Sequence, residues 1–158
     1  MDRRATKLSA LLAGVVLLAG CSGAVTVPLT PQQMNERYAP MVQSIKDELT
    51  SRSSMYTWGE VPQAQAYRSE GNCRVSIYFL AEKNDQWTRE HWIRWDDELL
   101  QRVNDIVTAY GFEARDSIGH VPSQLAAYLN TNAEGAELMV RLQTSITIRV
   151  NSPSYSCG

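Results

Sequence analysis

The sequence predicts an α+β fold in two layers, with two main helices on one face of a four- or five-stranded, mostly antiparallel sheet. Apolar residues recur at helical spacing in two stretches, which is typical of amphipathic helices. Apolar and polar residues alternate between positions 138 and 150, which indicates a strand with one buried and one wet face. The chain length fits a single domain, expected over residues 31–158.

The first helix is expected to begin at Pro31 and to end near Arg52. Thr30 can cap it, Pro31 suits the first helical position, and Gln33 can complete a capping box. Pro40 lies inside this helix and is expected to kink it or to split off a first turn. The apolar stripe consists of Met34, Tyr38, Met41, Val42, Ile45 and Leu49.

Two strands and a loop are expected next. The run Tyr56-Thr57-Trp58 predicts a short strand, and residues 62–71 are polar, with turn formers, which predicts a surface loop. Residues 74–81 are rich in Val, Ile, Tyr and Phe and predict a second strand. Its buried side is expected to carry Val75, Ile77 and Phe79.

The second helix is expected to start at Asp85 or Thr88 and to end before Gly111, which suits the left-handed position after a helix. Its stripe consists of Trp92, Trp95, Leu99, Val103, Ile106 and Tyr110. Residues 112–118 then predict a strand, residues 124–129 a strand or a short helix, and residues 130–135 a turn. The alternation over 138–150 predicts one unusually long strand, with Thr144 marking a bulge.

The N-terminus has the pattern of a secretory signal peptide over residues 1–20. Arg3, Arg4 and Lys7 precede an apolar run at residues 8–19, which is too short to span a bilayer and has the length of a signal core. The tetrapeptide ending at Cys21 is Leu-Ala-Gly-Cys and is similar to the lipobox of bacterial lipoproteins. That similarity implies a diacylglyceryl group on the Cys21 thiol, with residues 21–30 as lipidated N-terminus and tether. The alternative is an ordinary signal peptide and a chance cysteine.

Charge excludes some partners. The 15 basic and 17 acidic residues include three and one, respectively, within residues 1–20, so removal of that segment changes the formal net charge from −2 to −4. Mild acidity argues against a nucleic-acid partner, which requires a basic patch. It also gives the domain no attraction to an anionic bilayer. The lipid is therefore expected to hold the protein at the extracytoplasmic face of the cell membrane, where two acyl chains suffice.

Cys73 and Cys157 are the two remaining cysteines. An even pair in an exported protein favours a disulfide. Cys73 begins a predicted strand and Cys157 follows the last one, and antiparallel neighbours would bring these ends together. A metal site and a reactive thiol are the alternatives, but neither cysteine has a histidine or second cysteine at metal-ligand spacing.

The order of these features resembles the small actinobacterial lipoproteins of the mycobacterial LppA type. The matching features are the lipobox at Cys21, the pair Thr57-Trp58 before the polar loop, Cys73 at a strand start, Ala109-Tyr110-Gly111 at a helix end, and Gly135-Ala136-Glu137-Leu138 before a strand running on to Cys157. The resemblance implies a cell-envelope lipoprotein with a disulfide from the first core strand to the chain end. It implies no activity, because the family has no assigned biochemical role.

No catalytic constellation is visible. The chain has no phosphate loop, no G-x-S-x-G and no H-E-x-x-H. His91 is five and six residues from Asp96 and Asp97, whereas neighbours on a helix are three or four apart. His120, with Asp116 nearby, is the better candidate because loops carry function. We therefore expect no enzyme, no metal and no cofactor beyond the covalent lipid.

Three tryptophans are the candidate contact residues. Trp92 and Trp95 fall on the predicted helical stripe, so the core is their expected place, whereas Trp87 precedes the stripe and is expected to be exposed. The leading hypothesis is a non-enzymatic envelope protein that binds a protein or glycan partner. The alternative is a carrier or sensor of a small lipid or apolar ligand, held between helix and sheet in a pocket lined by Met34, Met41, Trp92 and Trp95.

Overall fold

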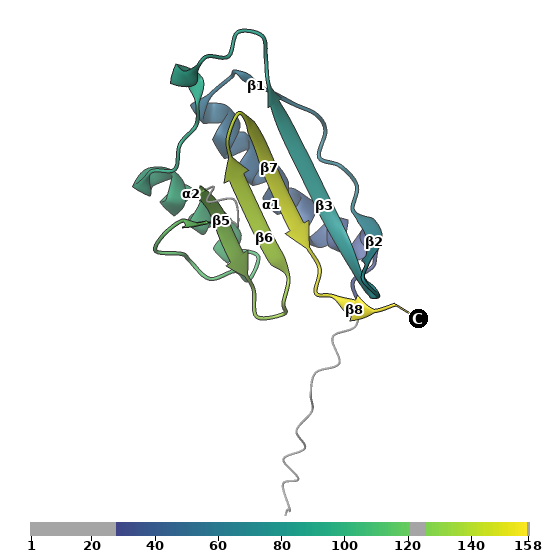
Figure 1. Cartoon of the computed structure of the whole chain (residues 1–158). Coiled ribbons are helices and arrows are strands. Elements are labelled where there is room, and N and C mark those ends of the chain that lie inside the picture. Colours follow the sequence, from purple (N-terminus) through teal and green to yellow (C-terminus); the bar gives the residue numbers. More distant parts are fainter. Residues whose placement is uncertain (1–27, 121–125, 158) are drawn as a thin grey trace, which may run out of the picture.

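The predicted two-layer α+β architecture is confirmed by a computed structural model, which describes residues 28–120 and 126–157. Figure 1 shows the helices α1 (Pro31–Arg52) and α2 (Asp97–Thr108) on one face of the sheet, with the other face open to the viewer. Among the described residues, no helix has the length and apolar character needed to cross a membrane.

The first helix forms as the sequence predicts. Thr30 and Gln33 complete the capping box, since each backbone N–H donates to the other's side chain, at 2.9 and 3.2 Å. The helix continues through Pro40 without a break, so the first turn is not split off. Pro40 and Glu36 are both exposed, so the carbonyl that loses its N–H partner at Pro40 can be hydrated instead. All six predicted apolar positions are buried.

Within residues 28–120 and 126–157 the sheet has eight strands, more than the four or five predicted, and all of its described pairings are antiparallel. The order is β1-β3-β7-β6-β5-β4, and β2 and β8 also pair with β3. The strands are β1 (Tyr56–Trp58), β2 (Gln65–Ser69), β3 (Asn72–Lys83), β4 (Gly119–His120), β5 (Ala126–Thr131), β6 (Glu137–Leu142), β7 (Ser145–Asn151) and β8 (Tyr155–Ser156).

The long alternating segment is a hairpin and not one bulged strand. β6 and β7 pair with Leu142 opposite Ile146 and Leu138 opposite Val150. Opposed residues in this register have the same parity, and opposed residues lie on the same face of a sheet. The turn at Thr144 therefore leaves the alternation unbroken, which is why the sequence pattern hid it.

Two segments differ from the prediction. Residues 65–69, predicted as loop, form β2 against the start of β3; the exposed, polar character of this edge strand concealed it. Residues 112–118, predicted as a strand, have no regular structure. Side-chain amides hold that backbone: Asn104 bonds both the N–H and the C=O of Arg115, and Asn130 donates to the carbonyl of Glu113. The predicted segment 124–129 is strand in its described part, and residues 121–125 lie outside the described residues.

The core lies between the helices and one face of the sheet. From β3 it takes Val75, Ile77 and Phe79, as predicted. The C-terminal residues are attached to this strand in two ways. β8 pairs with the beginning of β3, and the predicted disulfide joins Cys73 to Cys157 with a Cα–Cα distance of 5.4 Å. Figure 1 shows that α1 runs from the end of the sheet that carries β8 to the end that carries β1.

Candidate functional site

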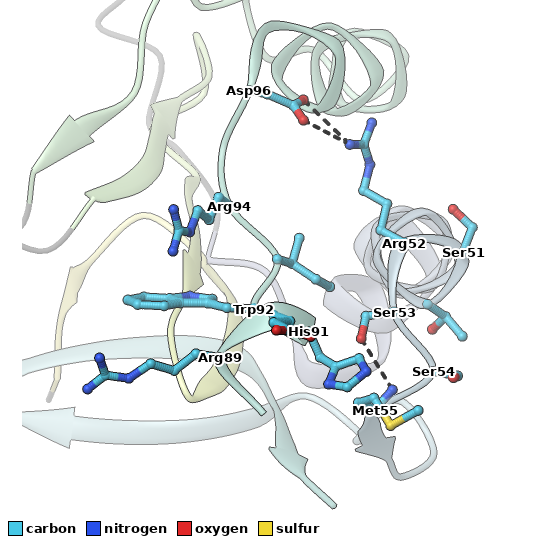
Figure 2. A pocket seen from close by; sticks show the side chains of 13 residues that line it. Ser51, Arg52, Ser53, Ser54, Met55, Arg89, His91, Trp92, Arg94 and Asp96 are labelled. Atoms are coloured by element: carbon cyan, nitrogen blue, oxygen red, sulfur yellow. Dashed lines mark hydrogen bonds and ion pairs between the residues drawn. The ribbon is translucent and has the colours of Figure 1, made fainter. Parts of the chain in front are cut away.

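A polar groove of about 820 Å³ opens between the C-terminal end of α1 and residues 89–96. Arg52, Ser53 and Met55 line one wall, and His91, Ile93 and Asp96 are among the residues of the other (Figure 2). Its size is within the range of ligand pockets, although its lining is more polar than usual.

The second wall is the segment in which the predicted second helix fails to form. Thr88 caps only the short 3₁₀ turn η1 (Arg89–His91), and residues 92–96 are not helical, with extended backbone at Trp92 and at Asp96. Asp96 caps α2, its carboxylate accepting the N–H of Leu99 at 2.7 Å. The helix therefore begins at Asp97, because an aspartate at this position satisfies a free N–H of the first turn.

This conformation takes Trp92 and Trp95 out of the predicted helix and reverses the predicted placement of Trp92, whereas Trp95 still packs against the core. In extended backbone, successive side chains point to opposite sides, so Ile93 enters the core while Trp92 remains 38% exposed. Trp95 is half-buried and stacks on Tyr128, with ring centroids 5.9 Å apart. Neither residue lies on a helix, and Trp92 is not in the core as the helical spacing had predicted.

Trp87 was predicted to be exposed, but it is half-buried against the core. Its indole nitrogen is buried, and the ammonium of Lys83 lies 5.2 Å from its ring centroid. The backbone N–H of Trp87 donates a hydrogen bond to the backbone carbonyl of Asn84, which fixes the turn that carries the Trp87 side chain. Trp87 therefore packs under the loop and does not present a free indole.

The exposed aromatic of this region is Trp92, and two arginines flank it. The Arg94 guanidinium carbon lies 5.5 Å from the Trp92 ring centroid, within reach of a cation–π interaction. Figure 2 shows Arg89, Trp92 and Arg94 projecting the same way, away from the end of α1. Neither arginine makes an ion pair within the described part of the chain. We call these three residues the Trp92 cluster.

Arg52, by contrast, joins the two walls of the groove through ion pairs, so its guanidinium is not available to a ligand. Its guanidinium lies 3.0 Å from Glu48, 3.3 Å from Asp96 and 3.6 Å from Glu98. These ion pairs join the end of α1 to the start of α2. They hold the two walls of the groove at a fixed separation. The guanidinium groups of the Trp92 cluster, which form no such ion pairs among the described residues, remain available at this end of α1.

The groove holds no triad of nucleophile, base and acid among its described residues. His91 Nδ1 accepts the N–H of Thr88 at 3.2 Å, so the neutral ring carries its proton on Nε2. The Ser51 hydroxyl donates to the carbonyl of Glu48, and Ser53 Oγ accepts the N–H of Met55. These groups cap turns, and no described trio of His, Cys, Asp or Glu clusters as a metal site would require.

The other predicted site residues are distributed elsewhere. Cys73 and Cys157 are joined as a disulfide at the opposite end of α1 from the groove. Cys21 and the predicted signal sequence lie outside the described residues, and His120 lies in β4. The sequence marks Trp92 as a contact candidate and places Arg89 and Arg94 near it. Because the acidic residues 96–98 balance these arginines, the pattern favours a solvated charged face over a joint binding site.

Comparisons with protein-family models, with curated proteins and with solved structures give no match to this chain.

Proposed function

We propose that this chain is a lipid-anchored protein of the cell envelope, held at the extracytoplasmic face of the membrane, whose domain binds a protein or glycan partner and catalyses no reaction. The signal pattern and lipobox at residues 1–21 support the anchor. Their similarity to the small actinobacterial lipoproteins of the LppA type belongs to the same proposal.

The observation that carries the binding role is the position of the Trp92 cluster. α1 has 22 residues and is therefore roughly 33 Å long. Pro28 and Leu29 adjoin Tyr155 of β8 at one end of α1, and the cluster lies beside its other end. A domain tethered through Cys21 would thus carry its exposed indole and two unpaired guanidinium groups at the end remote from the tether. Tryptophan and arginine are the residue types most enriched at binding hot spots.

The alternative of a small apolar ligand between helix and sheet gains no support from the packing. Met34 and Met41, predicted to line that pocket, have no accessible surface, so neither borders a void that could admit even water. Trp92, predicted beside them, faces outward. The interior between the layers is occupied by side chains.

The test is co-purification of partners with the full-length, lipidated protein after crosslinking in cells. Trp92→Ala and Arg94→Ala should lose the partner, whereas Arg102→Ala, a change of an exposed arginine on α2, should retain it. A partner set that is identical for all four proteins, or no reproducible partner at all, would overturn the binding role of the cluster.

A further inference from the structure

The sheet face opposite the helices carries a row of side chains that the core does not use. The register places Tyr78 of β3 opposite Arg149 of β7, Arg149 opposite Met139 of β6, and Met139 opposite Leu129 of β5. Directly opposed residues lie on the same face. The row crosses three strand spacings and is therefore roughly 14 Å long. Figure 1 shows no helix in front of this face.

Two hollows lie on either side of Arg149. One, of about 490 Å³, is lined by Tyr67, Tyr78 and Gln65, and the other, of about 190 Å³, by Leu129 and Met139; Arg149 lines both. The tyrosines are 41% and 50% exposed. Arg149, whose side chain is exposed, thus lies between two hollows on the same row, and we call the pair of hollows the depression.

The charged side chains that line this depression are Arg149 and Glu137. Arg149 has no ion-pair partner among residues 28–120 and 126–157. The carboxylate lining the smaller hollow belongs to Glu137, which is already paired with Arg74. Among the described residues, Arg141, in the next row, bonds only the Thr147 hydroxyl, and its buried Nε has no partner there. The uncommitted guanidinium groups therefore favour an anionic occupant.

The polar groups of the larger hollow indicate what kind of anion fits. Tyr67, Tyr78 and Gln65 form no side-chain hydrogen bonds within the described parts of the chain, so two hydroxyls and an amide face the hollow with free donors and acceptors. Aromatic faces beside free polar groups suit ligands that alternate C–H surfaces with hydroxyls. A carboxylate meets a guanidinium in a charge-assisted, bidentate geometry.

We propose that the open sheet face binds a linear, carboxylate-bearing glycan that crosses the strands, with a carboxylate at Arg149 and sugar rings against Tyr67 and Tyr78. This site is separate from the Trp92 cluster and does not rest on the function proposed for it. An acidic protein segment would satisfy the charge, but it would make less use of the free hydroxyl and amide groups.

The probe is a short oligomer of galacturonic acid, titrated into the full-length protein in non-ionic detergent. The neutral galactose oligomer and a glutamate oligopeptide of similar length serve as comparison ligands. Galacturonate should bind, Arg149→Gln and Tyr78→Ala should each weaken it at least tenfold, and Arg102→Gln and Trp92→Ala should leave the affinity unchanged. Thermal midpoints of all variants establish that each remains folded, which is expected because the changed side chains are exposed.

Four outcomes would overturn the proposal. They are the absence of galacturonate binding, equal affinity for the neutral oligomer, equal weakening by Arg102→Gln, and preferential binding of the glutamate peptide, which would make the face a site for an acidic protein segment. Selective galacturonate binding that depends on Arg149 and persists in Trp92→Ala supports it, and that result holds whether or not the Trp92 cluster has a partner.

Discussion

The buried hydroxyl of Tyr128 donates a hydrogen bond to Oδ1 of Asn104 at 2.9 Å, which joins the sheet to α2. The same amide of Asn104 also bonds both the N–H and the C=O of Arg115. One side chain thus satisfies a tyrosine and a loop at once, because a buried amide needs partners for each of its donors and acceptors. This network keeps residues 112–118 irregular where the sequence predicts a strand.

Tyr128→Phe should destabilise the fold by about 1–3 kcal/mol at neutral pH, since it leaves buried polar atoms of Asn104 and Asn130 short of a partner. Urea unfolding measures this directly. Tyr110→Phe is the control, because the half-buried Tyr110 hydroxyl has no hydrogen-bond partner among the described residues. Equal stability of the two variants would contradict the role of the network.

Stability should fall at alkaline pH. Burial raises the pKa of Tyr128 and of Tyr38 above the ordinary value of 10.0, outweighing the hydrogen bonds that lower it. A raised folded-state pKa contributes stability that is present below about pH 10 and is lost as the pH rises through the folded-state pKa. Tyr128→Phe should therefore decline less steeply than wild type above pH 10. Parallel declines in urea unfolding between pH 9 and 11 would exclude Tyr128 as a source of the loss.

Cys73→Ser should lower the thermal midpoint under non-reducing conditions. The bridge spans 84 residues, and the chain-entropy model gives about 4.5 kcal/mol for a loop of that length. For a domain of this size, such a loss corresponds to a midpoint lower by more than about 10 °C. Cys157→Ser should behave identically, and the double variant should add nothing further. An unchanged midpoint would mean that the bridge does not stabilise the folded chain.

Ile93→Ala and Trp92→Ala should separate stability from binding at adjacent positions. Ile93 is 6% exposed and Trp92 38%, so truncating Ile93 should cost about 2–4 kcal/mol and truncating Trp92 less than about 1 kcal/mol. Chemical denaturation compares them. A helical 85–96 segment with Trp92 in the core would give the opposite order, which makes this pair a test of the extended conformation.

If Cys21 carries the proposed lipid, Cys21→Ala should release the domain from the membrane fraction while leaving it folded, because two acyl chains suffice for stable anchoring and the formal net charge provides no attraction to an anionic surface. Cell fractionation with detergent-free washes measures the distribution. Retention of the variant on the membrane would contradict lipidation as the anchor, and Cys73→Ser, which alters a different cysteine, should remain membrane-bound.

Period and parity explain how much of the fold the sequence could predict. The stripe from Met34 to Leu49 specified α1 and its buried face, since a capping box and a 3.6-residue period agreed. The alternation over 138–150 specified the buried face of β6 and β7 correctly while hiding the turn at Thr144. Whether a residue number is odd or even indicates the face of the sheet on which the side chain lies, but it does not show where the chain turns. The sequence pattern therefore predicted one strand where there are two.

The candidate site was harder to predict because the controlling interactions are local and polar. Trp92, Trp95 and Leu99 fit a helical period, but the carboxylate of Asp96 caps α2 and ends that pattern at its N-terminal side. The cap formed by the Asp96 side chain thus determines whether Trp92 is buried in the core or exposed on the surface. The row from Tyr78 to Leu129 was beyond prediction for another reason, since it depends on strand order and register.

Site-specific photocrosslinking of the full-length protein in living cells tests the central claim most directly. A photoreactive residue at position 92 should give a reproducible adduct with one protein or glycan, and the same residue at the exposed position 102 should not. Adducts that are the same at both positions, or no adduct from position 92, would contradict a binding role for this end of the domain.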